Sequence, residues 1–390
     1  MSLIRNLRFQ YFIAFVSAVF AGFANSKMLI CTASVISNNF VLLFKWCSLP
    51  MIALSILSTT SHLTNNQELF LLGKKVLKYT LLTTILAASI ALSLFLLINP
   101  SNLSIYQLSF TFSSSFKSDQ GLFGILLLTT VVSTLVISSI ILNCRVQLRL
   151  RLERHFILCY QGFVAIIQKL LKFMPIAIWA FITLFIREVD GLAIKSLLSY
   201  LLCILLANII QATVLLPMLL KFKNISALSL LKAMWPALII AFWSKSSSVA
   251  LPVAIQCATE KARISQKIAQ FSLPLCTTIN MNACAAFILI TVLFVSTSYG
   301  VTFSPIALIG FIVIATIAAI GNAGVPMGCF TLSMALLAYL NVPLQAMGLI
   351  LPFYVFIDMV ESAINVWSDI CVTAVVEEEI QSFKKKTTTI

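Results

Sequence analysis

The stretch FIDMVESAINVWSD, residues 356–369, places carboxylate, amide and hydroxyl side chains within an otherwise apolar part of the chain. Its polar positions are Asp358, Glu361, Ser362, Asn365 and Asp369. On a helix at about 100° per residue, four of them fall within an arc of roughly 60°, and Glu361 lies beside that arc. An ionised carboxylate at the centre of a bilayer costs at least about 2.5–3.5 kcal/mol, so each acid needs a partner or a proton. The stretch therefore predicts a membrane helix with one cation-binding face.

Composition supports a membrane location for this helix. Of 390 residues, 60% are hydrophobic and 10% are charged, which excludes an ordinary soluble protein of this length. Apolar runs long enough to cross about 30 Å of hydrocarbon recur along the whole chain, so we expect one polytopic all-α membrane domain and no soluble domain. The ten cysteines are scattered without a C-x-x-C pair, which predicts small buried hydrophobes and neither a metal site nor a disulfide framework.

The net charge of +14 could indicate nucleic-acid binding, but the basic residues gather between apolar runs and form no basic domain. They concentrate in alternate segments: Arg5 and Arg8; Lys74, Lys75 and Lys78; Arg145, Arg149, Arg151 and Arg154; Lys221, Lys223 and Lys232. The positive-inside rule then predicts a multi-pass protein of the cell's inner membrane, with both termini cytoplasmic and the lipid bilayer, not nucleic acid, as its surroundings.

The chain has two parts, which differ in whether polar residues interrupt the apolar segments. Six conventional spans are predicted at 9–29, 38–58, 77–98, 121–142, 157–186 and 194–220. After residue 230, polar and small residues interrupt the apolar segments at WSKSSSVALP (243–252), TTINMNAC (277–284) and AAIGNAGVPMG (318–328). Broken helices leave backbone groups that lipid cannot satisfy, so these segments must line a hydrated, protein-enclosed cavity. Secondary transporters place substrate and coupling ions in such cavities.

The first and third interruptions are interpreted as tips of re-entrant hairpins. In the first, three serines supply hydroxyls and Pro252 starts a new helical arm. In the third, glycines allow unusual backbone angles and Pro326 blocks helix continuation. A kinked span explains either stretch alone equally well. Two such tips on either side of a broken helix favour hairpins.

Two other interpretations of the acidic residues, a ladder of salt bridges and catalysis, fit the sequence less well. A ladder of salt bridges lacks bases, because the apolar segments of this half offer only Lys245. Catalysis also fails, because Asp358 and Asp369 would lie about 16 Å apart along one helix, and neither His62 nor His155 is near them. Sodium fits better, since it is a hard ion that takes oxygen ligands. We therefore expect a transporter with no catalytic residues and no resident cofactor.

Four motifs, in order, resemble the dicarboxylate/amino acid:cation symporters, a family that includes glutamate and aspartate transporters and neutral amino-acid exchangers. SKSSSVALP is similar to its serine-rich first hairpin, LPLCTTINMNACAAF to its broken seventh span, AAIGNAGVPMG to its second hairpin, and IDMVESAINVWSD to its eighth span. The resemblance covers nearly the whole chain. It is weak in the first six spans and strong from about residue 240 onward.

The resemblance implies a fold and an assembly. Eight transmembrane helices plus two re-entrant hairpins would form an elevator-type transporter with inverted repeats, acting as a homotrimer. Residues 1–230 would be mainly scaffold, with the third and sixth spans moving with the core. Residues 231–377 would be the transport core and 378–390 a cytoplasmic tail.

It also implies site residues. The positions matching sodium ligands are Thr83, Thr84, Cys276, Thr278, Asn280, Asn282, Ala319, Ile320, Asn322, Asn365 and Asp369. The positions matching the substrate site are Ser246, Ser247, Ser248, Cys284, Gly324, Val325, Asp358, Glu361, Ser362 and Asn365. Asp358 would take the α-amino group of an amino acid, and Asn365 its α-carboxylate.

Departures from the family pattern refine the hypothesis. Glu361 stands where members with acidic substrates carry an arginine, so a dicarboxylate would meet a like charge unless Lys245 pairs with Glu361. Cys284 replaces a substrate-binding threonine, and Asn282 replaces an aspartate at a third sodium site. We therefore expect a symporter that imports a neutral amino acid with sodium or protons as coupling ions. The alternatives are a glutamate, aspartate or C4-dicarboxylate symporter and, from another class, an ion channel.

Overall fold

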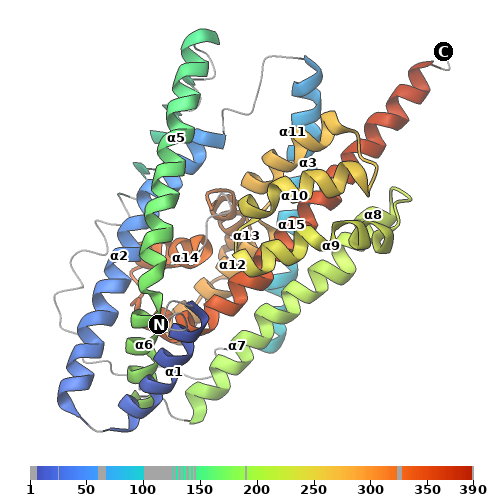
Figure 1. The fold of residues 1–390 in the computed structure, drawn as a ribbon. Helices are drawn as coiled ribbons and strands as arrows, with labels where there is room; N and C mark the ends of the chain where they lie inside the picture. Colours follow the sequence, from blue (N-terminus) through green and yellow to red (C-terminus); the bar gives the residue numbers. More distant parts are fainter. Residues whose placement is uncertain are drawn as a thin grey trace.

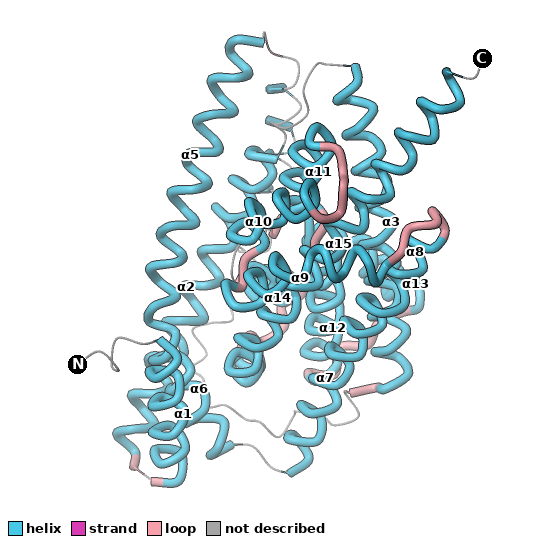
Figure 2. The backbone as a smooth tube through the Cα atoms, turned by 45° about the vertical axis from the view of Figure 1, so that its right-hand side comes forward, coloured by secondary structure: helices cyan, strands magenta, loops and turns pink. Residues whose placement is uncertain are grey.

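The computed structural model describes residues 7–24, 26–59, 67–100, 146–188, 191–322 and 327–388, together with scattered positions between 126 and 144. Within these ranges every regular element is a helix, and no strand occurs. Figure 2 shows how short the described loops between these helices are. The predicted all-α class is confirmed for the described part of the chain, while the count of eight membrane crossings stays a prediction.

Four helices from the first half of the chain form one packed group. They are α1 (Leu7–Phe23), α2 (Lys27–Thr59), α5 (Val146–Leu170) and α6 (Met174–Glu188). Helix α1 packs on α6, and α2 packs on both α5 and α6; Figure 1 shows α2 and α5 running side by side. A glycine allows α1 to approach α6, because a Cβ at Gly22 would lie 2.8 Å from the Cβ of Ile186.

The bounds of these helices correct two predicted spans. The span predicted at 9–29 ends at Phe23, and α2 already starts at Lys27, where the Ser26 carbonyl accepts from the Ile30 amide. The span predicted at 157–186 is divided between α5 and α6, with the short 3-10 turn η4 (Leu171–Phe173) between them. Pro175 has no amide hydrogen and suits the first turn of a helix, so the chain restarts there. The span predicted at 121–142 lies largely outside the described residues.

Helix α3 (Gln67–Ile98) joins the second half of the chain in space. It packs against α7 (Gly191–Ile210), α11 (Gln266–Ile279), α12 (Asn282–Ser298) and α13 (Pro305–Ile320). Helix α7 continues through the π-helical turn η5 (Gln211–Leu215) into α8 (Leu216–Lys221). The α7–α8 run matches the span predicted at 194–220, apart from the π-helical turn within it.

The first interrupted segment is a pair of packed helices, α9 (Ala227–Ser244) and α10 (Ser247–Glu260). The chain turns at Lys245, whose φ of 55° is left-handed, and Ser246 caps α10 by accepting from the Val249 amide. The prediction that Pro252 starts the second arm is wrong, because α10 begins at Ser247 and Pro252 lies inside it. The serine cap determines where the helix begins, since it satisfies an amide of the first turn.

The other two interruptions also separate helices. Asn280 and Met281 divide α11 (Gln266–Ile279) from α12 (Asn282–Ser298). Helix α13 (Pro305–Ile320) ends before Gly321 and Asn322, and α14 (Gly328–Tyr339) follows, both packing on α12. The predicted breaks in INMN and in GNAGVPMG are therefore confirmed as breaks, whereas their depth in a membrane stays a prediction.

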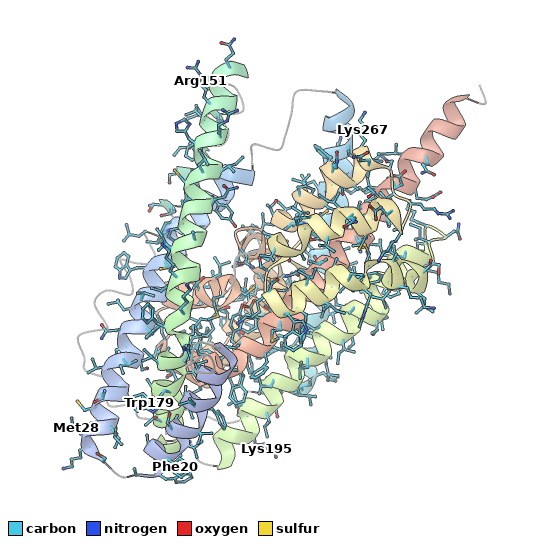
Figure 3. All side chains as sticks on the ribbon, viewed as in Figure 1. Phe20, Met28, Arg151, Trp179, Lys195 and Lys267 are labelled. Atoms are coloured by element: carbon cyan, nitrogen blue, oxygen red, sulfur yellow. The ribbon has the colours of Figure 1, made fainter. Side chains whose placement is uncertain are left out.

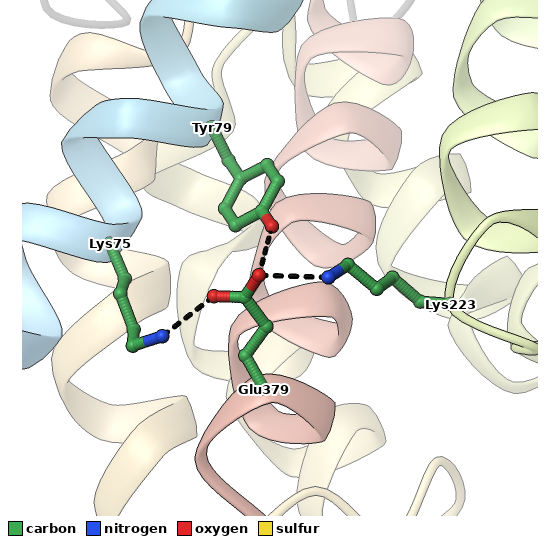
Figure 4. A network of polar contacts seen from close by, with 4 residues as sticks. All are labelled: Lys75, Tyr79, Lys223 and Glu379. Atoms are coloured by element: carbon green, nitrogen blue, oxygen red, sulfur yellow. Dashed lines mark hydrogen bonds and ion pairs between the residues drawn. The ribbon is translucent and has the colours of Figure 1, made fainter. Parts of the chain in front are cut away.

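Helix α15 (Gln345–Thr388) is 44 residues long and crosses the molecule beside α9, α11 and α12. Glu379, near its end, accepts hydrogen bonds from Lys75 at 2.7 Å, from Lys223 at 2.8 Å and from the Tyr79 hydroxyl (Figure 4). This carboxylate therefore links α15 to α3 and to the loop after α8.

Helix α12 lies at the centre of the main core. Every residue of it except Thr297 is buried, and it contacts α3, α7, α13, α14 and α15. Five segments of the described helices are long and apolar enough to cross a membrane: Leu72–Ile98, Lys195–Lys221, Ala227–Ser244, Gln266–Ser298 and Ala346–Gln381. By length and composition, these segments are typical of an integral membrane protein.

The outer surface is apolar at many positions. Phe20 is 73% exposed and Met28 is 81% exposed at one end of the molecule (Figure 3). Figure 3 places Arg151 and Lys267 at the opposite end. The segment of Arg151, predicted to be cytoplasmic, thus lies at the end opposite Phe20 and Met28, and the orientation across the membrane remains a prediction.

Candidate functional site

The polar face of α15 is buried inside the protein. All five of its predicted residues are at most 6% exposed: Asp358, Glu361, Ser362, Asn365 and Asp369. Asp369 faces the break between α11 and α12, and Asn365 faces the start of α12. Burying this many polar groups is stable only where partners satisfy them.

A first group of side chains surrounds Asp369. The Nδ2 of Asn280 donates to Asp369 Oδ1 at 3.0 Å, and the Thr277 hydroxyl donates to Oδ2 at 3.4 Å. Ser368 accepts from Nδ2 of Asn280 at 2.9 Å and from Nδ2 of Asn282 at 2.6 Å. The side chains of Asn280 and Asn282 therefore both connect the helix break to α15.

Helix α3 completes this group from the other side. The hydroxyl of Thr84 donates to Oδ1 of Asn282 at 2.6 Å, and that of Thr83 donates to Oδ1 of Asn280 at 3.2 Å. We call these side chains the oxygen cluster, which consists of Thr83, Thr84, Asn280, Asn282, Ser368 and Asp369. It offers carboxylate, amide and hydroxyl oxygens, the ligand types that a hard cation takes.

A second group lines a small cavity about one helical turn away on α15. Six of the predicted substrate residues line it: Ser247, Cys284, Asp358, Glu361, Ser362 and Asn365. Its volume is about 10 Å³, which is roughly the space that one water molecule needs. Lys245 lines the same cavity, so a cation and two carboxylates share it. A ligand larger than a water molecule does not fit this cavity unless the surrounding helices move apart.

Asn365 and Asn322 connect this cavity to the helix ends. The Oδ1 of Asn365 accepts from the Ala283 amide at 3.0 Å, which satisfies a free amide at the start of α12. The Nδ2 of Asn322 donates to the thiols of Cys284 at 3.1 Å and Cys329 at 3.3 Å. A Cβ at Gly328 would lie 1.4 Å from the Asn322 Oδ1, so glycine is needed where α14 begins.

Several predicted residues lie elsewhere or serve the backbone. The Ser246 hydroxyl caps α10, and Ser248 is exposed. The Thr278 hydroxyl donates to the Leu275 carbonyl at 2.7 Å. Gly324 and Val325 lie outside the described residues. The predicted backbone ligands are partly used within the helices: the Cys276 carbonyl accepts from Asn280 at 2.7 Å, and the Ala319 carbonyl accepts from Asn322 at 3.1 Å. Ile320 packs against a hydrophobic cluster that includes residues of α11 and α15.

Comparison with known proteins identifies the family. A model of the sodium:dicarboxylate symporter family matches residues 7–379. The chain belongs to this family. The match includes both the oxygen cluster and the cavity beside it, so the sodium:dicarboxylate symporter fold positions the buried face of α15.

Individual relatives of the sodium:dicarboxylate symporter family match the chain over part of its length. A putative sodium-dependent excitatory amino acid transporter, glt-4, of Caenorhabditis elegans is 31% identical over 189 residues, or 48% of this chain and 38% of the relative. Excitatory amino acid transporter 3 of Mus musculus is 31% identical over 55% of this chain and 41% of the relative. Neutral amino acid transporter B(0) of Mus musculus is 30% identical over 45% of this chain and 32% of the relative. The matches thus span less than half of these curated relatives.

Sequence reasoning missed Ser368 and Thr277, which lie beside Asp369, and Cys329, which lies beside Asn322. Ser368, next to Asp369, accepts hydrogen bonds from both asparagines of the helix break; its position on the same helix edge was the available signal. Cys329 lies against Asn322 and Cys284, and no pattern in the sequence pointed to it.

Proposed function

We propose that this member of the sodium:dicarboxylate symporter family imports a small neutral amino acid together with sodium ions. The family supports coupled transport, and its relatives include proteins named as excitatory and as neutral amino acid transporters. The main support for a neutral substrate is the buried carboxylate of Glu361, which lines the cavity beside Asp358 and Asn365.

The oxygen cluster would bind sodium as a co-transported ion. Asp369 supplies the formal negative charge, and the amides and hydroxyls around it supply neutral oxygens. In the structure, Asn280 and Thr277 donate hydrogen bonds to this carboxylate. Binding would exchange these donors for the cation, and the Asn280 side chain would turn its oxygen toward the ion.

The cavity would hold the amino acid. Asp358 would pair with the α-amino group, while the side-chain amide of Asn365 would donate to the α-carboxylate. Glu361 would then face the substrate's side chain. An acidic side chain would bring a second carboxylate into a buried site, which costs several kcal/mol unless a cation compensates it.

The transport cycle follows from the packing. Helices α9–α15, with α3 and α7, hold the oxygen cluster and the cavity, and we propose that they move together as an elevator. The group of α1, α2, α5 and α6 would be the fixed scaffold and would contribute to a homotrimer in the inner membrane. Because the cavity measures only about 10 Å³, opening between α14 and its neighbours would admit the substrate.

Transport in proteoliposomes tests the proposal. Purified protein is given labelled alanine, serine, glutamate or aspartate, each with and without an inward sodium gradient, with protein-free vesicles as the control. We expect saturable, sodium-driven accumulation of alanine or serine. If only the acidic amino acids accumulate, the transported substrate is a dicarboxylate and not a neutral amino acid. Ion conductance without accumulation of any solute would identify a channel.

A further inference from the structure

Three ligand-type side chains meet next to the cavity from three different helices. Cys284 is on α12, Cys329 on α14 and Glu361 on α15. One ligand atom from each lies within 4.8 Å of the other two, and each residue is at most 2% exposed. We call these three residues the thiol–carboxylate cluster. We propose that it binds one thiophilic divalent metal ion, of the class of Zn²⁺ and Cd²⁺.

The environment of the Glu361 carboxylate favours cation binding. Although Glu361 is 1% exposed, neither of its oxygens has a hydrogen-bond partner among the described residues. An unpaired buried carboxylate is costly, and a metal ion is one of the few ligands that offset it. Two thiols and one carboxylate within this spacing are a donor set that Zn²⁺ takes, with a fourth position left for water or another ligand.

The donor types separate this cluster from the oxygen cluster. Thiolates are soft ligands that select zinc-like ions, whereas sodium takes oxygen ligands. The Nδ2 of Asn322 already donates to both sulfurs, an arrangement that stabilises negative charge developing on them. Each thiol gives up its proton when its sulfur binds the metal, so binding releases at least two protons per ion.

Metal binding would join three helices that the proposed transport cycle must separate. Cys329 belongs to α14, while Cys284 and Glu361 belong to α12 and α15. A bound ion would hold α14 against both neighbours and keep the cavity closed. The metal would therefore act as an inhibitor of transport.

Cadmium titration of the purified full-length protein tests the site directly. We expect one Cd²⁺ per chain, with the ultraviolet charge-transfer absorption of cadmium–thiolate bonds, and competition by Zn²⁺. Cys284→Ser, Cys329→Ser and Glu361→Gln should each weaken binding at least about tenfold, since losing a direct ligand costs no less than losing a residue that hydrogen-bonds to a ligand. Cys203→Ala, which removes a buried thiol on α7, should leave binding unchanged.

The result does not depend on the transported solute. Absence of the charge-transfer band in the wild-type protein would overturn the proposal, as would equal Cd²⁺ affinity in the three cluster variants and the wild type. Gel-filtration elution checks that each variant is folded. The three variants remove different ligands on different helices, so any one that folds decides the question.

Discussion

Asn280 donates its side-chain amide to Asp369 across 3.0 Å, which ties the break between α11 and α12 to α15. The break leaves Asn280 and Met281 outside regular helix, and the side chain of Asn280 reaches the carboxylate. Asp369 is 1% exposed, so its charge must be balanced from within the protein or by an ion. This relationship makes the carboxylate the first residue to test.

Replacing Asp369 by asparagine should raise the sodium concentration that gives half-maximal uptake. The substitution removes the formal charge and one set of oxygen lone pairs while keeping the shape of the side chain. Uptake of labelled substrate against sodium concentration measures the effect, with Glu260→Gln, a carboxylate on the exposed surface of α10, as the control. An unaltered sodium dependence would show that Asp369 is not a ligand.

Thr84→Val should weaken sodium binding and lower stability together. The Thr84 hydroxyl donates to Oδ1 of Asn282 at 2.6 Å, and valine keeps the shape but leaves a buried amide oxygen with a poorer partner. Such a loss costs about 1–3 kcal/mol. Thermal unfolding in detergent, with and without sodium, should show a lower midpoint and a smaller sodium shift. The matched control is Ser93→Ala on the same helix, whose exposed hydroxyl bonds only to the Ser89 carbonyl; an equal loss in both variants would refute the assignment.

Gly328→Ala should disturb the start of α14 through Asn322. The added Cβ would lie 1.4 Å from the Asn322 Oδ1, so the amide must turn and give up its hydrogen bonds to the two thiols. We expect a stability loss of about 1–3 kcal/mol. Gly310→Ala on α13, where a Cβ would meet nothing within 4 Å, should be neutral or slightly stabilising.

A double-mutant cycle separates this clash from a change in backbone freedom. In an Asn322→Ala background the obstructing oxygen is gone, so Gly328→Ala should cost little. Additive losses in the double variant would mean that the glycine serves another purpose.

Local patterns predicted the parts of the site that lie within one helix or at its ends. The polar face of α15 was predictable because 100° per residue places Asp358, Asn365 and Asp369 together. The break at Asn280 was predictable because amides interrupt an apolar run. The start of α10 was predicted at the wrong residue, because the prediction took Pro252 as the helix start, whereas Ser246 caps the helix.

Contacts between helices were beyond this kind of reasoning. Cys284 and Cys329 belong to α12 and α14, and only packing brings them to Glu361. The cysteines are scattered along the sequence, so their spacing predicted no metal site. Spacing along the chain carries no information on contacts between different helices. The fifth predicted span failed for a related reason, since its apolar composition continues across the restart at Pro175.

Glu361→Arg should shift the substrate preference toward acidic amino acids. The change reverses the charge in a cavity that already holds Asp358, so a side-chain carboxylate would gain a partner. Competition by aspartate and by serine against labelled substrate measures the preference. Glu361→Gln is the control that removes charge without reversing it, and it should show a smaller shift. If aspartate competes no better in the arginine variant than in the wild type, Glu361 does not face the substrate's side chain.

Glu379→Gln should loosen the end of α15 in a salt-dependent way. Glu379 pairs with Lys75 and Lys223 (Figure 4), and its hydrogen bond raises the pKa of Lys223. Their side chains are 34% and 31% exposed, and pairs of this kind contribute up to about 1 kcal/mol each. Thermal unfolding should show a loss of about 1–2 kcal/mol at low ionic strength, and the difference from wild type should shrink in high salt.

Glu377→Gln provides the contrast, because Glu377 accepts from the Ser265 amide and hydroxyl at 3.1 and 2.7 Å and its effect should persist in salt. A loss at Glu379 that is equally large at every salt concentration would assign its role to hydrogen bonding with Tyr79 and not to the two ion pairs.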